Sequence, residues 1–339
     1  MKGLLGACSF NQRELIWSKY MLRQFWTLML TFVVFLAAPN AGNTMFNGHV
    51  SIVNSVAFSS NGNLALSGSW DWTMRLWDLS THKSIKKFKD HSLSVNEAVF
   101  SPDGKLVLSA SADTTLKLWR ISDGKPFLTL KGHNGMVTAA AFLPNGKSIL
   151  SGSTDRSLIL WDLASGSIIS RLVGHEGPVL AVEVSSDGST AISSSYDGTL
   201  RRWNLKTGQT EQIFEGHRFN VNDVALSKSG KTMVSGSVDE TVKFWDVLNG
   251  EVLRTFHGHE GFVAAVAITS DGKKALSAGK DKIVRLWDLD SGELIHAMEG
   301  HEKVVWSVAF SPDEKTALSG GGDEVLRLWD LSSGSEISR

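Results

Sequence analysis

The sequence predicts an all-β protein made of seven repeats, each with four short antiparallel strands, stacked in a ring or a solenoid. Histidine recurs seven times at a fixed step of 42 residues, from His49 to His301, and tryptophan and aspartate keep the same step. Turn-forming residues occur every 8–12 positions, and residues 44–339 show no sustained helical periodicity. Because the step is strict, no repeat has gained or lost a residue in any loop.

One period, residues 258–299, illustrates the order of elements. A Gly-His pair opens it, and an apolar strand follows at 263–268 before a Ser-Asp-Gly-Lys turn at 270–273. A second strand ends at Ser277, a turn surrounds Asp281, and a third strand ends at Asp288. After a Ser-Gly turn at 291–292, a last strand carries Leu294 and Ile295. Each repeat therefore predicts four strands.

This Gly-His…Trp-Asp pattern resembles that of the WD-repeat (tryptophan–aspartate) β-propeller family. The resemblance covers residues 44–339, although Asp90 replaces the glycine before His91, and the Trp-Asp pair becomes Trp119-Arg120 and Trp203-Asn204. It implies a seven-bladed β-propeller of four-stranded antiparallel blades at residues 42–339. We expect the ring to be closed by an N-terminal strand that pairs into the last blade.

The resemblance also implies a buried hydrogen-bond network of histidine, serine, aspartate and tryptophan in each blade, which links the strand turns. Its residues, blade by blade, are His49, Ser67, Asp71, Trp77; His91, Ser109, Asp113, Trp119; His133, Ser151, Asp155, Trp161; His175, Ser193, Asp197, Trp203; His217, Ser235, Asp239, Trp245; His259, Ser277, Asp281, Trp287; and His301, Ser319, Asp323, Trp329. Serine, histidine and aspartate are also the residue types of a catalytic triad. Sevenfold recurrence without a Gly-x-Ser-x-Gly turn favours the structural role, so we expect no catalytic residues and no enzyme.

The final repeat ends early, because residues 335–339 match only Ser167 to Arg171 on the 42-residue step. Phe46 matches Leu172, Phe256 and Met298 in the same slot. We therefore expect residues near Thr44 to Asn47 to complete blade 7, beside or in competition with Glu336 to Arg339. The stop at Arg339 is equally compatible with a longer parent protein that has lost a C-terminal domain.

Residues 1–41 form a leader of different composition. An apolar run of 14 residues at 25–38 follows Lys19 and Arg23 and ends in small residues, as in a secretory signal peptide. Met21 is a more usual start, so residues 1–20 are interpreted as a spurious extension and residues 21–41 as the signal peptide. The run is short for a membrane span, so no stable span is expected. The alternative is an uncleaved leader that anchors the protein to a membrane.

Composition narrows the classes of ligand. The only cysteine is Cys8, so a mature chain has no internal disulfide and no thioether haem site. The formal charge of −1 becomes about −4 without the leader, which argues against nucleic acid as a partner. No zinc spacing, phosphate-binding loop or calcium-binding loop is present, so we expect no cofactor and no metal.

In the WD-repeat family, partners usually dock on the narrow face around the central channel, at positions three and five residues after each histidine and just before each aspartate. Carried over to this chain, the expected partner-binding residues are Ile52, Asn54, Trp70, Met136, Leu180, Tyr196, Asn220, Asn222, Phe262, Val304 and Trp306. Apolar members gather in blades 6, 7 and 1 and again in blades 3 and 4. Away from these, Glu97 and Asp223 are interpreted as lining a watery channel that could hold a cation, and Glu183 and Arg202 as a structural ion pair.

We therefore expect an exported (periplasmic or extracellular), monomeric, non-enzymatic scaffold that binds a protein or peptide on its narrow face. Two alternatives remain open. One is an accessory domain of a larger extracytoplasmic protein, such as a c-type cytochrome or another redox protein. The other is a cytoplasmic scaffold whose leader is not a signal.

Overall fold

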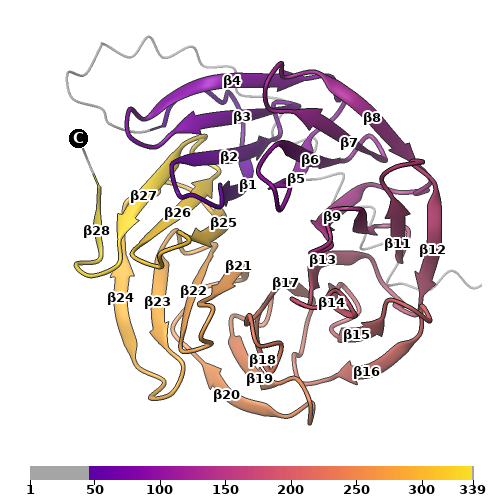
Figure 1. Ribbon diagram of the computed structural model, residues 1–339. Coiled ribbons are helices and arrows are strands. Elements are labelled where there is room, and N and C mark those ends of the chain that lie inside the picture. The colour runs from indigo at the N-terminus through magenta and orange to yellow at the C-terminus, as the bar shows by residue number, and fades with distance from the viewer. Residues whose placement is uncertain (1–45, 338–339) are drawn as a thin grey trace, which may run out of the picture. The chain divides into compact units, whose positions relative to one another are not determined.

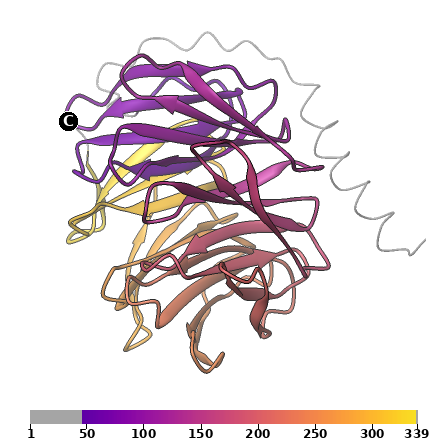
Figure 2. The same ribbon diagram turned by 45° about the vertical axis from the view of Figure 1, so that its right-hand side comes forward.

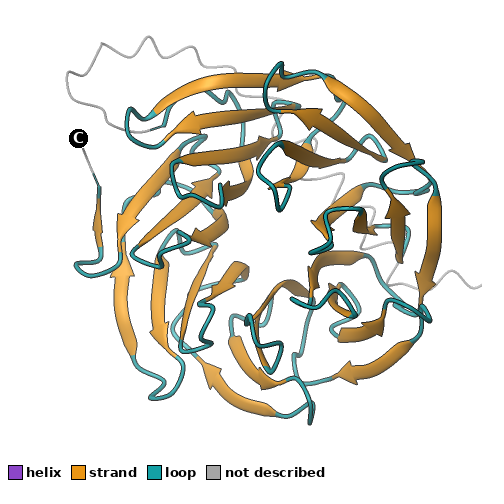
Figure 3. Ribbon diagram, in the orientation of Figure 1, coloured by secondary structure: helices purple, strands orange, loops and turns teal. Residues whose placement is uncertain are grey.

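The computed structural model describes residues 46–337, in which the chain forms seven four-stranded antiparallel sheets. Within these residues strands are joined by turns and loops, and no helix is present (Figure 3). The described part accordingly holds no helix able to cross a membrane. Figure 1 shows the sheets as seven blades around a common axis, which confirms the predicted fold class. The leader prediction for residues 1–41 lies outside the described residues.

Each blade takes four consecutive strands, and the bounds follow in chain order. Blades 1 to 4 consist of β1 (Val53–Phe58), β2 (Leu64–Ser69), β3 (Thr73–Asp78), β4 (Lys83–Lys89); β5 (Val95–Phe100), β6 (Leu106–Ser111), β7 (Thr115–Arg120), β8 (Pro126–Lys131); β9 (Val137–Phe142), β10 (Ser148–Ser153), β11 (Ser157–Asp162), β12 (Ile168–Val173); and β13 (Val179–Val184), β14 (Thr190–Ser195), β15 (Leu200–Asn204), β16 (Thr210–Phe214). Blades 5 to 7 consist of β17 (Val221–Leu226), β18 (Thr232–Ser237), β19 (Val242–Asp246), β20 (Val252–Phe256); β21 (Val263–Ile268), β22 (Lys274–Gly279), β23 (Val284–Asp288), β24 (Leu294–Met298); and β25 (Val305–Phe310), β26 (Thr316–Gly321), β27 (Leu326–Asp330), β28 (Ser335–Glu336).

The first strand of every blade lies nearest the axis, and the fourth lies at the rim of the ring (Figure 1). These seven innermost strands, β1, β5, β9, β13, β17, β21 and β25, are called the axial wall. Each of them contacts the innermost strands of both neighbouring blades, and β25 contacts β1, so the wall is closed. Figure 2 shows neighbouring blades stacked face to face around the ring.

Burial follows strand order within a blade. All six residues of β10, a second strand, are buried, because sheets cover both of its faces. The outer strand β4 instead alternates, with charged residues facing solvent and Phe88 facing inward. The network tryptophans are all nearly inaccessible and pack between blades, together with valines and leucines from the adjoining sheets. The hydrophobic core is thus a set of interfaces between blades, and each blade depends on its neighbours.

The outer edge of blade 7 is assembled from both ends of the described chain. Strand β28 pairs with β27 through Glu336 and Trp329, and the Ile337 amide donates to the Leu328 carbonyl at 2.7 Å. Phe46 continues the same edge through an antiparallel bridge to Leu326. Leu326 corresponds to Val284, which pairs with Met298 in blade 6, so Phe46 occupies the slot expected from the 42-residue step.

The Phe46 ring is buried and meets Trp77 of blade 1 edge-on, with 5.8 Å between ring centroids. One aromatic side chain therefore joins the last blade to the first. The N-terminal and C-terminal segments lie side by side in this edge rather than competing for it. Residues 44, 45, 338 and 339 of the predicted closure fall outside the described range.

Candidate functional site

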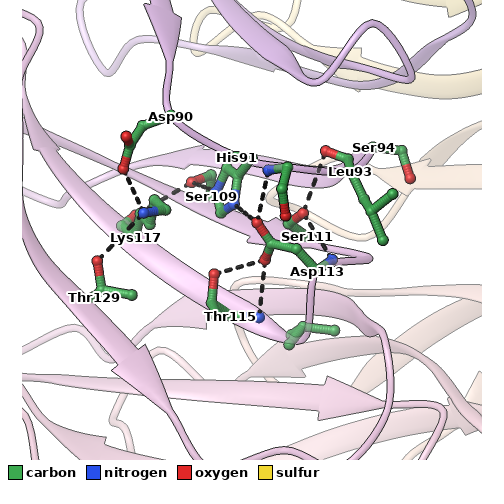
Figure 4. A network of polar contacts seen from close by, with 12 residues as sticks. Asp90, His91, Leu93, Ser94, Ser109, Ser111, Asp113, Thr115, Lys117 and Thr129 are labelled. Atoms are coloured by element: carbon green, nitrogen blue, oxygen red, sulfur yellow. Dashed lines mark hydrogen bonds and ion pairs between the residues drawn. The ribbon is translucent and has the colours of Figure 1, made fainter.

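A chain of hydrogen bonds links histidine, aspartate, serine and tryptophan in every blade. In blade 2, His91 Nδ1 lies 2.7 Å from Asp113 Oδ2 and His91 Nε2 lies 2.7 Å from Ser109 Oγ (Figure 4). Trp119 Nε1 donates to the same Ser109 Oγ at 2.9 Å. Across all seven blades the same three distances are 2.7–2.9, 2.7–2.8 and 2.8–2.9 Å. The structure therefore brings together all 28 residues assigned to the network.

The protonation pattern of the network follows from these contacts. Burial lowers the pKa of His49, although Asp71 partly opposes that shift, so the imidazole is neutral and its Nδ1–H donates to the carboxylate. Burial alone would raise the pKa of Asp71, but hydrogen bonds from His49, Thr73 and the Val50 amide outweigh it and hold the pKa below its ordinary range. The histidine Nε2 then accepts the hydroxyl proton of Ser67, whose oxygen accepts the indole N–H.

The network serines are fully inaccessible in every blade, with an exposed fraction of 0%. Their oxygens already serve both the histidine and the tryptophan, so these serines do not present a nucleophile to a substrate. What the network does instead is tie the loop that carries the histidine to the turn that carries the aspartate. These two connections define one face of the ring, called here the narrow face.

A positive charge beside the network was not anticipated from the sequence. The third strand carries a cation two residues before the tryptophan in six blades: Arg75, Lys117, Arg201, Lys243, Arg285 and Arg327. Blade 3 has Ile159 there, but Arg171 lies directly opposite on β12, 3.6 Å from Asp155 Oδ2. In blade 3 the positive charge is therefore on β12 instead of β11, and it lies near Asp155. Ile159 is the one exception in its 42-residue column, whereas the column of Arg171 also contains Lys87.

The predicted ion pair between Glu183 and Arg202 is wrong. Both residues lie opposite Ile192, one on β13 and the other on β15, so two strand spacings, about 10 Å, separate them. Arg202 instead pairs with Glu211 at 3.1 Å and donates to the Val247 carbonyl of blade 5. Glu183 belongs to the axial wall together with Glu97 and Asp223.

Burial raises the pKa values of these three carboxyls: Glu97 and Asp223 to about 7 and Glu183 to about 8. Repulsion among the carboxyls adds to the effect at Glu97 and Glu183. All three residues are partly exposed and lie on strands of the axial wall. Among the described residues, no group of three or more potential metal ligands is arranged to hold an ion.

The predicted partner-binding residues divide into two kinds. The Asn222 side chain forms a hydrogen bond within the ring, because its Nδ2 donates to the Val263 carbonyl of blade 6 at 2.8 Å. Asn96 and Thr138 form equivalent bonds to the next blade at their own positions. The others lie on the narrow face or at the start of the axial wall and are at least partly exposed: Ile52, Asn54, Trp70, Met136, Leu180, Tyr196, Asn220, Phe262, Val304 and Trp306.

The apolar group comes from three adjacent blades, because β21, β25 and β1 are successive strands of the axial wall. The rings of Phe262 and Trp306 lie 5.7 Å apart at an interplanar angle of 38°. Trp70 begins the turn between β2 and β3, and its amide donates to the Ile52 carbonyl in the loop before β1. The loop before β1 and this turn are held together by the His49–Asp71 bond.

Two further residues belong to this group and were missed from sequence. Val50, directly after His49, is 77% exposed, and Trp72, directly after Asp71, is 51% exposed. Trp72 has a φ of 68°, and this turn position has a positive φ in every blade, with glycine only in blade 4, at Gly198. We call Val50, Ile52, Trp70, Trp72, Phe262, Val304 and Trp306 the apolar rim. Phe219 and Leu93 are also exposed on the narrow face, in blades 5 and 2.

The repeat model described as "WD domain, G-beta repeat" matches seven successive segments of the chain: residues 42–78, 82–120, 124–162, 166–204, 208–246, 250–288 and 292–330. The chain belongs to the WD40 repeat family. WD40 propellers typically serve as non-catalytic scaffolds for protein interactions. Membership of this family is consistent with a hydrogen-bond network that holds the strands together and with a narrow face that is open to solvent.

Similarity to individual WD40 proteins extends over about one repeat. The chain is 54% identical over 39 residues to the Drosophila melanogaster protein named small ribosomal subunit protein RACK1, and 51% identical over 43 residues to the Candida albicans protein of that name. It is 48% identical over 44 residues to cross-pathway control WD-repeat protein 2 of Flammulina velutipes. These alignments cover 12–13% of this chain and 12–14% of the relatives.

Proposed function

We propose that this WD40 propeller is a non-enzymatic scaffold that binds a protein or peptide through the apolar rim on its narrow face. The observation that carries the proposal is the gathering of three tryptophans, one phenylalanine and three aliphatic side chains in blades 6, 7 and 1, all at least partly exposed. Aromatic side chains, tryptophan above all, dominate the energetics of protein interfaces, since each removes a large apolar area from water at a small entropic cost.

The exposure of Trp72 supports the same assignment. Its side chain is 51% exposed, so burial within the propeller does not account for a tryptophan at this turn. The positive φ there is common to all seven blades, and the other six have Thr114, Arg156, Gly198, Glu240, Lys282 and Glu324. A tryptophan that contributes to binding accounts for its presence at a turn where the other blades have small or charged residues.

The rim is tested with short peptides. Twelve-residue peptides selected from a random display library against the propeller are measured by fluorescence anisotropy against the protein and its variants. We expect W306A and W72A to weaken binding by roughly tenfold or more, as for a hot-spot residue. The matched control is L248A: Leu248 is 75% exposed, but it lies in the turn between β19 and β20, on the face opposite the histidine loops. Equal affinities for all variants would refute the assignment.

We also propose that the protein is exported and acts as a monomer. The support is the composition of residues 21–41, with its basic start, apolar run and small-residue end. N-terminal sequencing and intact mass of the protein from fractionated cells test the export. A start near Gly42 in the exported fraction supports it, and an unprocessed chain in the cytosol refutes it. A single mass of one chain in light scattering supports the monomer.

A further inference from the structure

The axial wall carries three carboxyl side chains and no basic one. Glu97 lies on β5, Glu183 on β13 and Asp223 on β17, while the other four strands of the wall contain no ionisable side chain. None of the seven strands contains lysine, arginine or histidine. The sign of the charge along the axis is therefore uniform.

The protein supplies only some of the hydrogen bonds that these three carboxyls can accept. Asp223 accepts from the amides of Val224 and Val266, both at 2.8 Å. Glu97 accepts from Ser55 Oγ at 2.8 Å through one oxygen. The Glu183 side chain has no hydrogen bond or ion pair with any residue of 46–337. Because ionised carboxylates in such surroundings are destabilised, an external cation near them would be attracted.

A short series of contacts connects the acidic part of the wall to the apolar rim. Ser307, which follows Trp306 on β25, accepts a hydrogen bond from the Val56 amide of β1 at 3.0 Å. Ser55, also on β1, donates to Glu97 and accepts from the Ala98 amide of β5 at 3.1 Å. Trp306 and Glu97 therefore stand on either side of β1, with the tryptophan closer to the narrow face.

We propose that the segment that binds the apolar rim inserts one lysine or arginine side chain along the ring axis toward Glu97, Glu183 and Asp223. The aliphatic stem of such a side chain suits an apolar entrance, and its charged end suits the carboxyls beyond it. Trp306 at the entrance also favours a cation through its ring face. The inference rests on the proposed function, because it concerns the partner of the same face.

A bare metal ion fits this arrangement less well, since the three carboxyls do not form a group able to hold one. An acidic partner is disfavoured by the sign of the wall charge. The occupant is thus a basic, partly apolar peptide segment of a protein.

The test uses the peptides selected on the intact propeller. The best binder is synthesised with its lysine or arginine and with norleucine in that place, which keeps an aliphatic stem and removes the charge. We expect norleucine to weaken binding by roughly tenfold or more. The combined variant E97Q/E183Q/D223N should show a similar loss, whereas E251Q, on an exposed turn, should bind as the unmodified protein does.

The pH profile gives a second readout that a merely structural role would not produce. The carboxyls ionise more fully as the pH rises from 6 to 9, while a lysine of the peptide remains charged because its ordinary pKa is about 10.4. Within the axial wall of the described chain, the three carboxyls are the only titratable groups, since the other four strands carry none. Binding of the basic peptide should therefore tighten across this range, and the combined variant should show no such change.

The outcomes separate the inference from the proposed function. Selected peptides that lack basic residues, or a norleucine peptide that binds equally well, overturn the inference; if W306A still weakens binding, the proposed function stands. Loss of selective peptide binding altogether overturns both. The norleucine comparison uses the unmodified protein, so it remains decisive even if the combined variant does not fold.

Discussion

The stability of the propeller should fall as the pH rises from mildly acidic to alkaline, and E183Q should remove the part of that fall that Glu183 contributes. The pKa of Glu183 is raised from an ordinary 4.5 to about 8, first by burial and then by the charges of Asp223 and Glu97. A carboxyl with a raised pKa binds a proton more tightly in the folded protein than in the unfolded chain. Its contribution is therefore fully favourable below about pH 4.5 and is lost progressively as the pH rises to about 8.

The size of the effect follows from the shift. One pKa unit corresponds to about 1.4 kcal/mol, so a rise from 4.5 to about 8 sets an upper limit of about 5 kcal/mol. Glu183 is partly exposed, and solvent screening reduces this figure, so we expect about 1–2 kcal/mol at pH 8. Glutamine has nearly the same shape and never ionises, so E183Q should match the unmodified protein near pH 4 and exceed its stability at pH 8.

Urea denaturation followed by tryptophan fluorescence at pH 4, 6, 8 and 9 measures this difference, since the unfolding slope reports the same exposed surface in both proteins. The control is E293Q, at an exposed position before β24, which should show no pH-dependent difference from the unmodified protein. A difference between E183Q and the unmodified protein that is flat with pH, or that makes E183Q less stable at pH 8, would refute the reasoning.

Three further predictions concern the network, the closure and the rim. S109A leaves His91 Nε2 and Trp119 Nε1 without their buried partner and should lower the free energy of unfolding by about 1–3 kcal/mol in urea denaturation. F46A empties a buried aromatic site between the last and first blades and should cost about 3–5 kcal/mol in the same assay. W72G relieves the positive φ and should leave stability unchanged or raise it by up to about 1 kcal/mol, while weakening peptide binding in anisotropy.

The controls for these substitutions come from exposed positions of the same type. S122A removes an exposed serine hydroxyl in blade 2, and F127A removes a phenylalanine that is 42% exposed on β8. Both should change the free energy of unfolding by less than about 1 kcal/mol. An F46A protein as stable as the F127A protein would mean that Phe46 does not close the ring. A W72G protein that loses stability would contradict the assignment of strain to Trp72.

The fold was predictable because its geometry repeats in the chain. A constant step of 42 residues requires identical connections in all blades, and it aligned Phe46 with Met298 although the two lie far apart in the sequence. The hydrogen-bond network could likewise be predicted by comparing positions 42 residues apart, since each blade repeats the same four residue types. Where a property depends only on position within the repeat, the sequence alone is sufficient.

Prediction from the sequence failed where the contacts of a side chain do not follow from its position in the repeat. Glu183 and Arg202 both depart from their columns in blade 4, but the register places two strand spacings between them. The hydrogen bond from Asn222 Nδ2 to the Val263 carbonyl of the next blade could not be predicted either, because residue type does not reveal which way a wall residue turns. Trp72 was missed because its turn position has no fixed residue type, and only the structure shows that its side chain is half-exposed.

The central claim is that the apolar rim of blades 6, 7 and 1 is the binding surface. Hydrogen-exchange mass spectrometry of the propeller, with and without a saturating selected peptide, tests it most directly. The account predicts protection confined to the loops before β1, β21 and β25 and to the turn between β2 and β3. Protection confined to the turns between β3 and β4 or between β19 and β20, on the opposite face, would contradict it.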